Sequence, residues 1–462
     1  MKSYVNSQPT TQYSATNAWN VNLNNGNVNN NTKTNGNQVR LISDFCNNPD
    51  TPEMRDFLDF AASMIEAYIL CLSNKRSNPN AAFFALRGLT ASVHLAEEIW
   101  SGSYAIAPGI IFVVRRPVPR EVCAATFRDR VVHVWVMSQL EPVFEALFPD
   151  AIMANRKGRG TMGAIIRTDT LVRETTEGYT RDAWVYTTDF QGFFMGLDKR
   201  IVNAATQEII DRYHTGPWRY ILKHLFATIT FNRPQLVARR RSPDSEWDLI
   251  APSKSLYHCD RWHGLAIGNL PSQWSACLMI MLALRILERH GIPTEQVVSY
   301  MDDTIIVLLD KVQFLAELSA IERELKEELN ITLHPRKRNL QHYSKGWKIV
   351  GGKGRMGRLY ASDRTIRRFR AKMHYLCTEV HDTQAAFASL NSYLGTLSKF
   401  RTRKVRAAEC EKALAVYGKE MYAANDYLKV VLRSRYNTRH MTLRRIRLAR
   451  SYNHRRLARL AA

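Results

Sequence analysis

Ser299-Tyr300-Met301-Asp302-Asp303-Thr304, followed by the apolar run 305–309, places two adjacent acids between two β-favouring segments. The pattern predicts two strands joined by a tight turn at Met301-Asp302. Two carboxylates at a hairpin tip repel each other unless a cation neutralises them. Mg²⁺ suits this position, because it takes oxygen ligands and keeps coordination sites for phosphates. The alternative is an acidic surface turn, because such a string arises by chance in a chain this long roughly one time in ten.

A third acid lies upstream, in Val185-Tyr186-Thr187-Thr188-Asp189-Phe190-Gln191-Gly192-Phe193-Phe194. This pattern predicts a strand ending at Asp189, a Gly-containing turn, and then a helix over 199–213. An acid at the end of a strand, beside exposed backbone N–H groups, is typical of a metal and phosphate site. We therefore expect the two strands to hold two metal ions for in-line phosphoryl transfer. One ion would activate a 3′-hydroxyl and the other would stabilise the leaving pyrophosphate.

The composition favours a polyanionic partner. The 462 residues carry a net charge of +23, and the pI is near 9.8. The alternative is a ribosome-associated or merely basic protein. The seven cysteines show no CxxC spacing, which is typical of reduced thiols in the cytoplasm. The N-terminus has no apolar signal core, and the apolar run 275–284 is stopped by Arg285. We therefore expect a cytoplasmic protein with no membrane partner.

The segment between residues 50 and 270 predicts helices and basic loops. Helices are expected from Thr51, over 81–100 and over 127–148, with a β-hairpin at 110–114 and 122–125. Arginines 115, 116 and 120 on this hairpin would suit a triphosphate, although a solvated basic hairpin explains them equally well. Gly268 would let a backbone approach a flat group such as a nascent base pair. The alternative is a capped helix N-terminus.

In this order, the motifs resemble those of reverse transcriptases, within the group II intron and retron-like branch, and most closely those of diversity-generating retroelements. The resemblance covers residues 50 to 405. It implies an α+β right-hand polymerase with fingers at 49–180, palm at 181–355, thumb at 356–430 and a basic tail at 431–462. The motifs that carry it are Pro119 to Ala125 with Phe127 to His133, Arg156 to Thr161, Asp189 to Phe194, Ile267 to Gln273, Tyr300 to Asp303, Leu333 to Lys337, Gly346 to Gly352 and Asn391 to Gly395.

The resemblance implies a role for each matching residue. Asp189, Asp302 and Asp303, with the backbone of Phe190, would hold two Mg²⁺ ions, for which Mn²⁺ would substitute. Phe194 would be a steric gate whose ring fills the space that a 2′-hydroxyl needs. Lys337 would lie near the leaving pyrophosphate as a proton donor. Residues implied around the deoxynucleotide are Arg120, the backbone N–H groups of Phe190, Gln191, Gly192 and Phe193, the Phe194 ring, Ile267, Gly268 and Lys337.

A further set is expected to contact template and primer. The Gly346 to Gly352 turn would brace the primer end, and the helical, basic tail would bind an RNA or RNA–cDNA backbone with salt-sensitive affinity. A floppy basic tail is the alternative. Residues implied on nucleic acid are Arg128, Arg130, Arg156, Lys157, Arg159, Gln273, Gly351, Arg444, Arg447, Arg455 and Arg456.

Ile267 stands where many reverse transcriptases have glutamine. Glutamine can hydrogen-bond and align the incoming nucleotide, whereas isoleucine cannot. A lost hydrogen bond is worth about 1 kcal/mol, which relaxes discrimination several-fold. In the resembled family this goes with misincorporation opposite template adenines. Three other departures are Val118 in place of lysine, Met195 in place of proline, and 349–352 in place of Phe-Leu-Gly-Tyr.

Residues 1–48 are crowded with asparagine and almost lack apolar content. Such a segment buries too little surface to offset its ordering entropy, so a disordered or loosely docked arm is expected. The stretch from Ala18 to Gly26 and on to Arg40 also resembles the translated template repeat of these elements. Asparagine codons begin with two adenines, so adenine-directed errors would diversify them. We hypothesise that the reading frame runs through, or was copied from, that repeat; a plain disordered arm is the alternative.

The sequence thus predicts an RNA-directed DNA polymerase of a bacterial, archaeal or phage-encoded element. It would copy structured element RNA into error-prone cDNA with a small basic accessory protein oligomer. The 431–462 tail is too short for a ribonuclease H domain, so template removal would come from elsewhere. The alternatives are a defence-associated or retron-type reverse transcriptase, and an inactive RNA-binding scaffold.

Overall fold

The computed structural model describes residues 17–22, 27–32, 52–73, 88–115 and 118–433. The chain divides into two compact units, of which unit 1 holds residues 1–160 and 186–339, and unit 2 holds 161–185 and 340–462. These boundaries differ from those expected for fingers, palm and thumb, so that three-part division stays a prediction.

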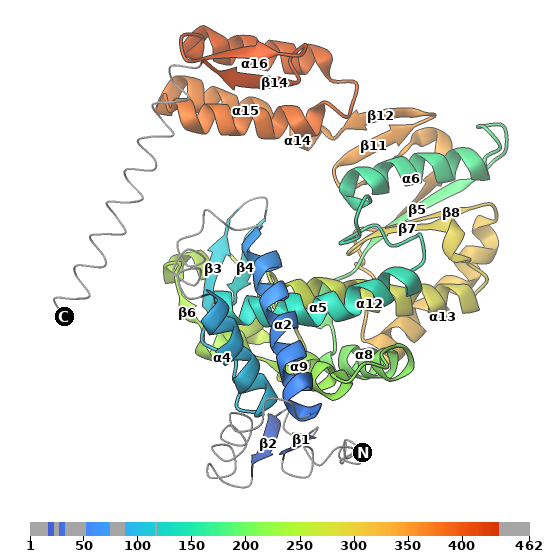
Figure 1. The fold of residues 1–462 in the computed structure, drawn as a ribbon. Helices are drawn as coiled ribbons and strands as arrows, with labels where there is room; N and C mark the ends of the chain where they lie inside the picture. Colours follow the sequence, from blue (N-terminus) through green and yellow to red (C-terminus); the bar gives the residue numbers. More distant parts are fainter. Residues whose placement is uncertain (1–16, 23–26, 33–51, 74–87, 116–117, 434–462) are drawn as a thin grey trace. The chain divides into compact units, whose positions relative to one another are not determined.

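Unit 1 is built around α12 (Leu270–Arg289), an apolar helix that packs against α5 (Phe127–Leu147) (Figure 1). The ring of Trp274 on α12 lies 5.9 Å from that of Phe144 on α5. By length and composition α12 could cross a membrane, but 78% of its most apolar window is buried inside the protein. Arg285, which interrupts the apolar run 275–284, lies on an exposed face of this helix.

The other helices of unit 1 surround this pair. α2 packs against both α4 and α5, and α8 packs against α9. The helix expected over 199–213 is confirmed in full, since Asp198 caps it by accepting from the Arg200 N–H. Their bounds are α2 (Pro52–Ser73), α4 (Gly88–Trp100), α7 (Phe193–Gly196), α8 (Lys199–Tyr213), α9 (Arg219–Phe231), α10 (Pro234–Val237), α11 (Asp244–Trp247) and α13 (Lys311–Leu329), with short turns η2 (Pro252–Lys254), η3 (Leu256–His258) and η4 (Thr294–Gln296).

Two sheets carry the residues of interest. The first has the strand order β7-β8-β5-β9, with β7 (Val297–Tyr300), β8 (Asp303–Leu308), β5 (Trp184–Asp189) and β9 (Asn339–His342). The second has the order β4-β3-β6, with β3 (Ile110–Val114), β4 (Arg120–Ala124) and β6 (Arg239–Arg240). The predicted strand ending at Asp189 and both predicted hairpins are confirmed, because their short β-branched runs alternate with turn residues.

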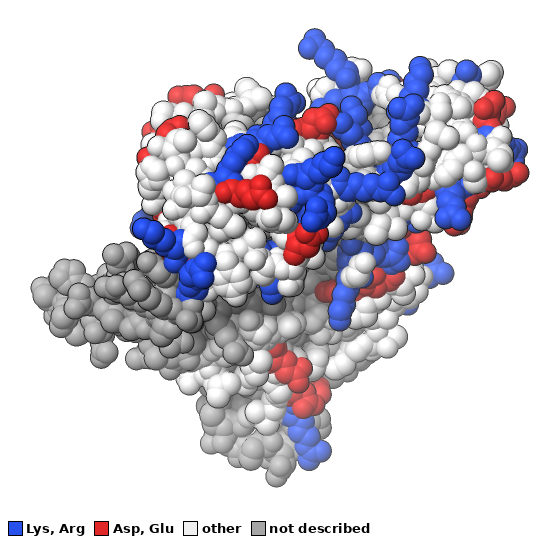
Figure 2. All heavy atoms as spheres, turned by 90° about the horizontal axis from the view of Figure 1, so that it is seen from above, with Lys and Arg blue, Asp and Glu red and all other residues white. Residues whose placement is uncertain are grey.

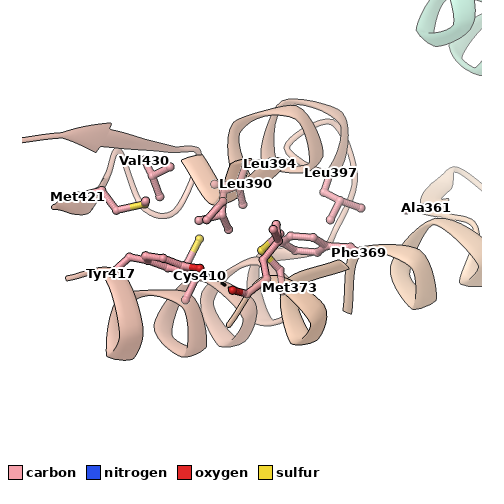
Figure 3. Packing of buried hydrophobic residues seen from close by; sticks show 13 residues of the cluster. Ala361, Phe369, Met373, Leu390, Leu394, Leu397, Cys410, Tyr417, Met421 and Val430 are labelled. Atoms are coloured by element: carbon pink, nitrogen blue, oxygen red, sulfur yellow. Dashed lines mark hydrogen bonds between the residues drawn. The ribbon is translucent and has the colours of Figure 1, made fainter. Parts of the chain in front are cut away.

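Unit 2 has its own core, shown in Figure 3. Phe369 and Met373 of α14 pack with Leu390 and Leu394 of α15 and with Cys410 of α16, all fully or almost fully buried. The elements are α6 (Gly160–Thr175), η5 (Tyr343–Lys345), β10 (Trp347–Ile349), β11 (Gly352–Arg355), β12 (Arg358–Ala361), α14 (Asp363–Tyr375), the π-helical η6 (Leu376–Val380), α15 (Thr383–Leu397), α16 (Arg403–Tyr417), β13 (Met421–Ala424) and β14 (Lys429–Leu432).

Two short strands lie in the asparagine-rich arm, whose expected disorder stays a prediction. β1 (Asn17–Asn22) and β2 (Asn27–Thr32) pair antiparallel, with Val21 opposite Val28. The rest of the arm and the predicted tail residues Arg444, Arg447, Arg455 and Arg456 lie outside the described residues.

Candidate active site

The acidic hairpin tip is held by hydroxyl groups. Met301 adopts a left-handed conformation with φ of 57°, which closes the turn between β7 and β8. The Ser299 hydroxyl donates to the Met301 carbonyl at 3.2 Å and lies 3.1 Å from the Thr304 hydroxyl. Tyr300 pairs with Asp303 in register. These contacts fix the backbone on which Asp302 and Asp303 stand.

Asp189 and Asp302 come together although 113 positions separate them in the chain. The Phe190 N–H donates to the Asp302 carbonyl at 3.3 Å, which joins the end of β5 to the hairpin tip. Burial, and next the negative charge of Asp189, raises the pKa of the Asp302 carboxyl above its ordinary value; Arg120 and Lys337 act in the opposite direction. The Asp302 carboxyl therefore lies among two cations and a second carboxylate.

Asp303 is the first residue of β8 and follows Asp302 directly. Within the described ranges, no group of three or more His, Cys, Asp or Glu side chains is arranged to hold a metal ion. The expectation that Asp189, Asp302 and Asp303 together bind metal therefore stays a prediction.

The turn after Asp189 is tied to residues 332–334. The Gln191 N–H donates to the Thr332 carbonyl at 2.8 Å, and the His334 N–H donates to the Asp189 carbonyl at 2.7 Å. The predicted triphosphate cradle is therefore corrected. The N–H groups of Phe190 and Gln191 are used by backbone pairing, which leaves those of Gly192 and Phe193. None of these bonds uses the Phe190 carbonyl, the predicted metal ligand.

Lys337 reaches the site from the loop before β9. Its Nζ lies 2.7 Å from Asp189 Oδ2, and its side chain is 54% exposed while that of Asp189 is 12% exposed. An ion pair with one partner this exposed contributes little to stability. A flexible lysine can therefore leave Asp189 at small cost when another cation or a phosphate arrives.

The residues predicted around the nucleotide lie close to one another. The half-buried side chains of Phe194 and Ile267 pack against one apolar cluster, formed by Ile111, Cys123, Met195 and Leu256. Arg120 is exposed at the start of β4, within electrostatic range of Asp302. Inside unit 1 the structure thus places Asp189, Asp302, Arg120 and Lys337 within electrostatic range of one another. Phe194 and Ile267 share the apolar cluster that includes Cys123 of β4, the strand that begins at Arg120.

Gly268 is exposed, but the side on which a Cβ would stand lies against strand β4. A Cβ at this position would lie 2.5 Å from the Cys123 carbonyl oxygen, and φ is +110°. The Cys123 N–H also donates to the Ile267 carbonyl at 2.8 Å. The backbone of β4 is one reason for glycine here, and the expected approach of Gly268 to a base pair stays a prediction. The next residue, Asn269, is the N-cap of α12 but makes no side-chain capping bond.

Three arginines predicted on nucleic acid pair with acceptors of the protein, and one of them, Arg156, is buried. Arg156 is 8% exposed, and its guanidinium donates to the Glu145 side chain and carbonyl and to the carbonyl of Pro149. Arg128 pairs with Glu98 and Asp129. The prediction for Arg156 is corrected, because its buried guanidinium is engaged by protein acceptors. The Arg128 side chain stays 25% exposed, and its role stays a prediction. Arg159 pairs with Asp150 at 2.6 Å but stays partly exposed.

Other predicted nucleic-acid contacts remain accessible. Lys157 is exposed and Arg130 is half-buried. Gln273 lies in the first turn of α12, where its carbonyl accepts from the Asn155 side chain at 2.9 Å. Gly351, in unit 2, has φ of +82° in the turn between β10 and β11. Their roles stay predictions.

Sequence reasoning missed a buried carboxylate one position after Arg120. Glu121 is 1% exposed and accepts from the Ser255 hydroxyl and from the Leu256 N–H, the latter at 2.8 Å. The alternation of a β-strand could have revealed this residue, because successive side chains point to opposite faces of the sheet. If Arg120 faces the site, Glu121 must face the interior and needs partners there.

Basic side chains also gather on the surface of the molecule, as Figure 2 shows for one face. The helix α14 of unit 2 carries five basic residues and one acid, Asp363. Such a surface suits a polyanion. The basic residues are Arg364, Arg367, Arg368, Arg370 and Lys372.

The arrangement in unit 1 defines a candidate site for phosphoryl transfer, since paired carboxylates beside Arg and Lys can hold divalent cations and phosphates together. The ammonium group of Lys337 already stands as a cation against Asp189. The predicted ligands are all oxygen donors, which Mg²⁺ prefers: the carboxylates of Asp189, Asp302 and Asp303 and the Phe190 carbonyl.

Comparison with solved structures finds telomerases, each 10% identical to this chain. Apo telomerase from Candida tropicalis truncated from its C-terminal domain has a TM-score of 0.40 and covers 56% of each chain. Telomerase from Candida albicans in complex with the TWJ fragment of telomeric RNA has a TM-score of 0.38, over 68% of this chain and 59% of its own. The chain thus spans less than two thirds of either protein. No family model matches the chain, and no curated protein matches it.

Proposed function

We propose that this chain is an RNA-directed DNA polymerase with a right-hand fold that transfers deoxynucleotides to a primer 3′-end. One observation carries the proposal: Asp189 and Asp302, from distant segments, meet beside Arg120 and Lys337. Two carboxylates this close, with Asp189 buried and Asp302 half-buried, repel each other unless cations neutralise them, and such clusters are concentrated at functional sites. Two-metal phosphoryl transfer requires this arrangement.

The side chains divide the work. Asp189, Asp302 and Asp303, with the Phe190 carbonyl, would hold Mg²⁺, and Arg120 would bind the triphosphate. Lys337, released from Asp189, would protonate the leaving pyrophosphate. The Phe194 ring would exclude a 2′-hydroxyl. The chemistry that two Mg²⁺ ions supply when bound is activation of the 3′-hydroxyl and neutralisation of the pyrophosphate charge.

The finer proposal is a reverse transcriptase of a diversity-generating retroelement, acting in the cytoplasm with structured element RNA and a small basic accessory oligomer. Ile267 supports it, because its apolar side chain packs against the cluster beside Phe194 and offers the nucleotide no hydrogen bond. A retron-type or defence-associated enzyme is the alternative within the same class. A neighbouring pair of template and variable repeats would distinguish the two.

A second candidate, an inactive RNA-binding scaffold, is favoured by the ion pair between Lys337 and Asp189. In such a protein the lysine would neutralise Asp189 permanently. The exposure of Lys337 opposes this, because a permanent buried pair would be closed to solvent on both sides.

Primer extension on an RNA template with Mg²⁺ tests the polymerase. The wild type should extend the primer, and Asp302→Asn should abolish extension. Asp310→Asn is the matched control, because Asp310 caps α13 through its side chain and asparagine caps equally well. Extension by the Asp302→Asn variant at the wild-type rate, or none by the wild type, would reject the polymerase.

Sequencing cDNA made in vitro from an RNA that contains all four bases tests the finer proposal. Errors should concentrate opposite adenines. An error spectrum that is even across the four bases would reject the retroelement assignment while leaving the polymerase standing.

A further inference from the structure

The chain between α10 and α12 forms a loop that we name the insert loop, residues 239–258. It begins as strand β6, which pairs parallel with β3 through Ile110 opposite Arg239. The Ser242 hydroxyl then accepts from the Val113 N–H at 3.0 Å. The loop is thus built onto the β3–β4 hairpin as an extra edge strand.

An arginine that contacts two rings fixes the middle of the insert loop. The Arg240 guanidinium lies 4.8 Å from the ring centre of Trp247 and 4.5 Å from that of Tyr257. Its Nε donates to the Tyr257 hydroxyl at 3.1 Å. Stacking of this kind favours one conformation of the loop.

Glu121 fixes the end of the insert loop. Its carboxylate accepts from the Ser255 hydroxyl and the Leu256 N–H, and Ser255 is 5% exposed while Leu256 is 2% exposed. A buried carboxylate is costly unless it is hydrogen-bonded, and removing it leaves the Leu256 N–H without an acceptor. The strand alternation that turns Glu121 inward leaves Arg120 exposed on the opposite face.

The loop end held by Glu121 lies behind the nucleotide-selecting residues. Leu256 belongs to the buried cluster against which Phe194 and Ile267 pack. A Cβ on Gly192 would lie 3.1 Å from the Ser253 carbonyl oxygen, so the turn at Gly192 also touches the loop. A shift of residues 252–258 would therefore remove the support of the predicted steric gate.

We infer that Glu121 is a positioning residue for nucleotide selection, because it holds residues 252–258 as the wall behind Phe194. This inference rests on the proposed polymerase function. Glu121 does not touch the nucleotide. It acts through Ser255 and Leu256, and it sets how firmly the Phe194 ring resists a ribonucleotide.

The test compares incorporation of a deoxynucleotide and the matching ribonucleotide by full-length variants. Glu121→Ala and Ser255→Ala should each lower the ratio of the two kcat/KM values, with Glu121→Ala lowering it about tenfold. This lies within the roughly hundredfold that a misplacement of about 1 Å can cost. Glu121→Gln should keep most of the ratio, because its amide can accept from Leu256 and donate to the Ser255 oxygen. In Glu121→Ala, KM for the ribonucleotide should fall, whereas kcat for the deoxynucleotide should change less.

Asp129→Ala is the matched control. Asp129 is also a fully buried carboxylate near the β3–β4 hairpin, and it accepts from the Tyr104 hydroxyl and the Ala107 N–H, away from the insert loop. Its loss should destabilise the protein without changing the ratio. An equal change of the ratio in Asp129→Ala and Glu121→Ala would overturn the inference.

Amide hydrogen exchange gives a readout that needs no catalysis. Glu121→Ala should speed exchange at residues 252–259 and also at 192–197, whereas Glu121→Gln and Asp129→Ala should not. Unchanged exchange at 192–197 in Glu121→Ala would overturn the inference. If the wild type extends no primer but this coupling is present, the positioning contact stands and the polymerase proposal alone fails.

Discussion

Replacing Gly268 with alanine tests the contact between the turn before α12 and strand β4. The new Cβ would lie 2.5 Å from the Cys123 carbonyl oxygen and 3.0 Å from Val122 Cγ1. Ordinary contact begins at 3.4 Å, so the turn and the strand must separate by about 0.9 Å. The nearest atom is backbone, which cannot rotate away as the end of a long side chain can.

The cost has two parts. A left-handed conformation costs an L-residue about 1–2 kcal/mol, and forced overpacking costs about 1–3 kcal/mol more. Gly291→Ala is the matched control, because Gly291 has φ of +75° but its nearest neighbour is 3.9 Å away. We therefore expect urea unfolding to show a loss of about 2–5 kcal/mol for Gly268→Ala and about 1–2 kcal/mol for the control.

The displaced strand also carries Arg120, so the effect should extend to nucleotide use. A displacement near 1 Å can lower a rate about a hundredfold. Gly268→Ala should therefore lower kcat/KM for the deoxynucleotide in primer extension by about tenfold to a hundredfold, and Gly291→Ala should not. Equal losses of stability and of kcat/KM in the two variants would refute the contact.

Three further predictions follow from individual ion pairs. Arg156→Ala should lower the free energy of unfolding in urea by about 1–3 kcal/mol, because the carbonyl of Pro149 and the half-buried Glu145 lose a donor, while the exposed Lys157→Ala should change little. Lys337→Met should leave stability nearly unchanged but move the pH midpoint of Mg²⁺-dependent extension upward, since Lys337 lowers the pKa of Asp302; a midpoint that stays in place would contradict this. Hydrogen bonding to Glu317 raises the pKa of His290, so its contribution to stability should be complete below about pH 6.5 and lost as pH rises through the raised value. Thermal unfolding against pH should show this loss in the wild type and not in His290→Gln.

The local elements followed from sequence because their signals are local. The strand ending at Asp189, the helix over 199–213 and the hairpin at 300–303 depend on runs of a few residues and on the turns between them. The meeting of Asp189 and Asp302 was expected because each acid borders a β-favouring run, and because the order of motifs resembles that of reverse transcriptases. Spacing alone could not have joined them.

The partners of individual side chains did not follow from sequence. Arg156 lies in a Gly-spaced basic loop. The sequence of such a loop does not distinguish a guanidinium that binds a phosphate from one that, as here, pairs with Glu145. The N–H groups of Phe190 and Gln191 were assigned to a phosphate because nothing local shows that residues 302 and 332 accept them. Long-range pairing decides such details, and a single sequence does not contain it.

Lys337 gives Asp189 a counter-ion that is attached to the polypeptide. In the proposed enzyme the metal would therefore enter by exchange with an ammonium group rather than by addition to a bare carboxylate. Affinity for the first ion falls by the cost of that exchange. When metal and pyrophosphate leave, Lys337 neutralises the Asp189 carboxylate again. Repulsion between Asp189 and Asp302 therefore does not push the two strands apart between turnovers.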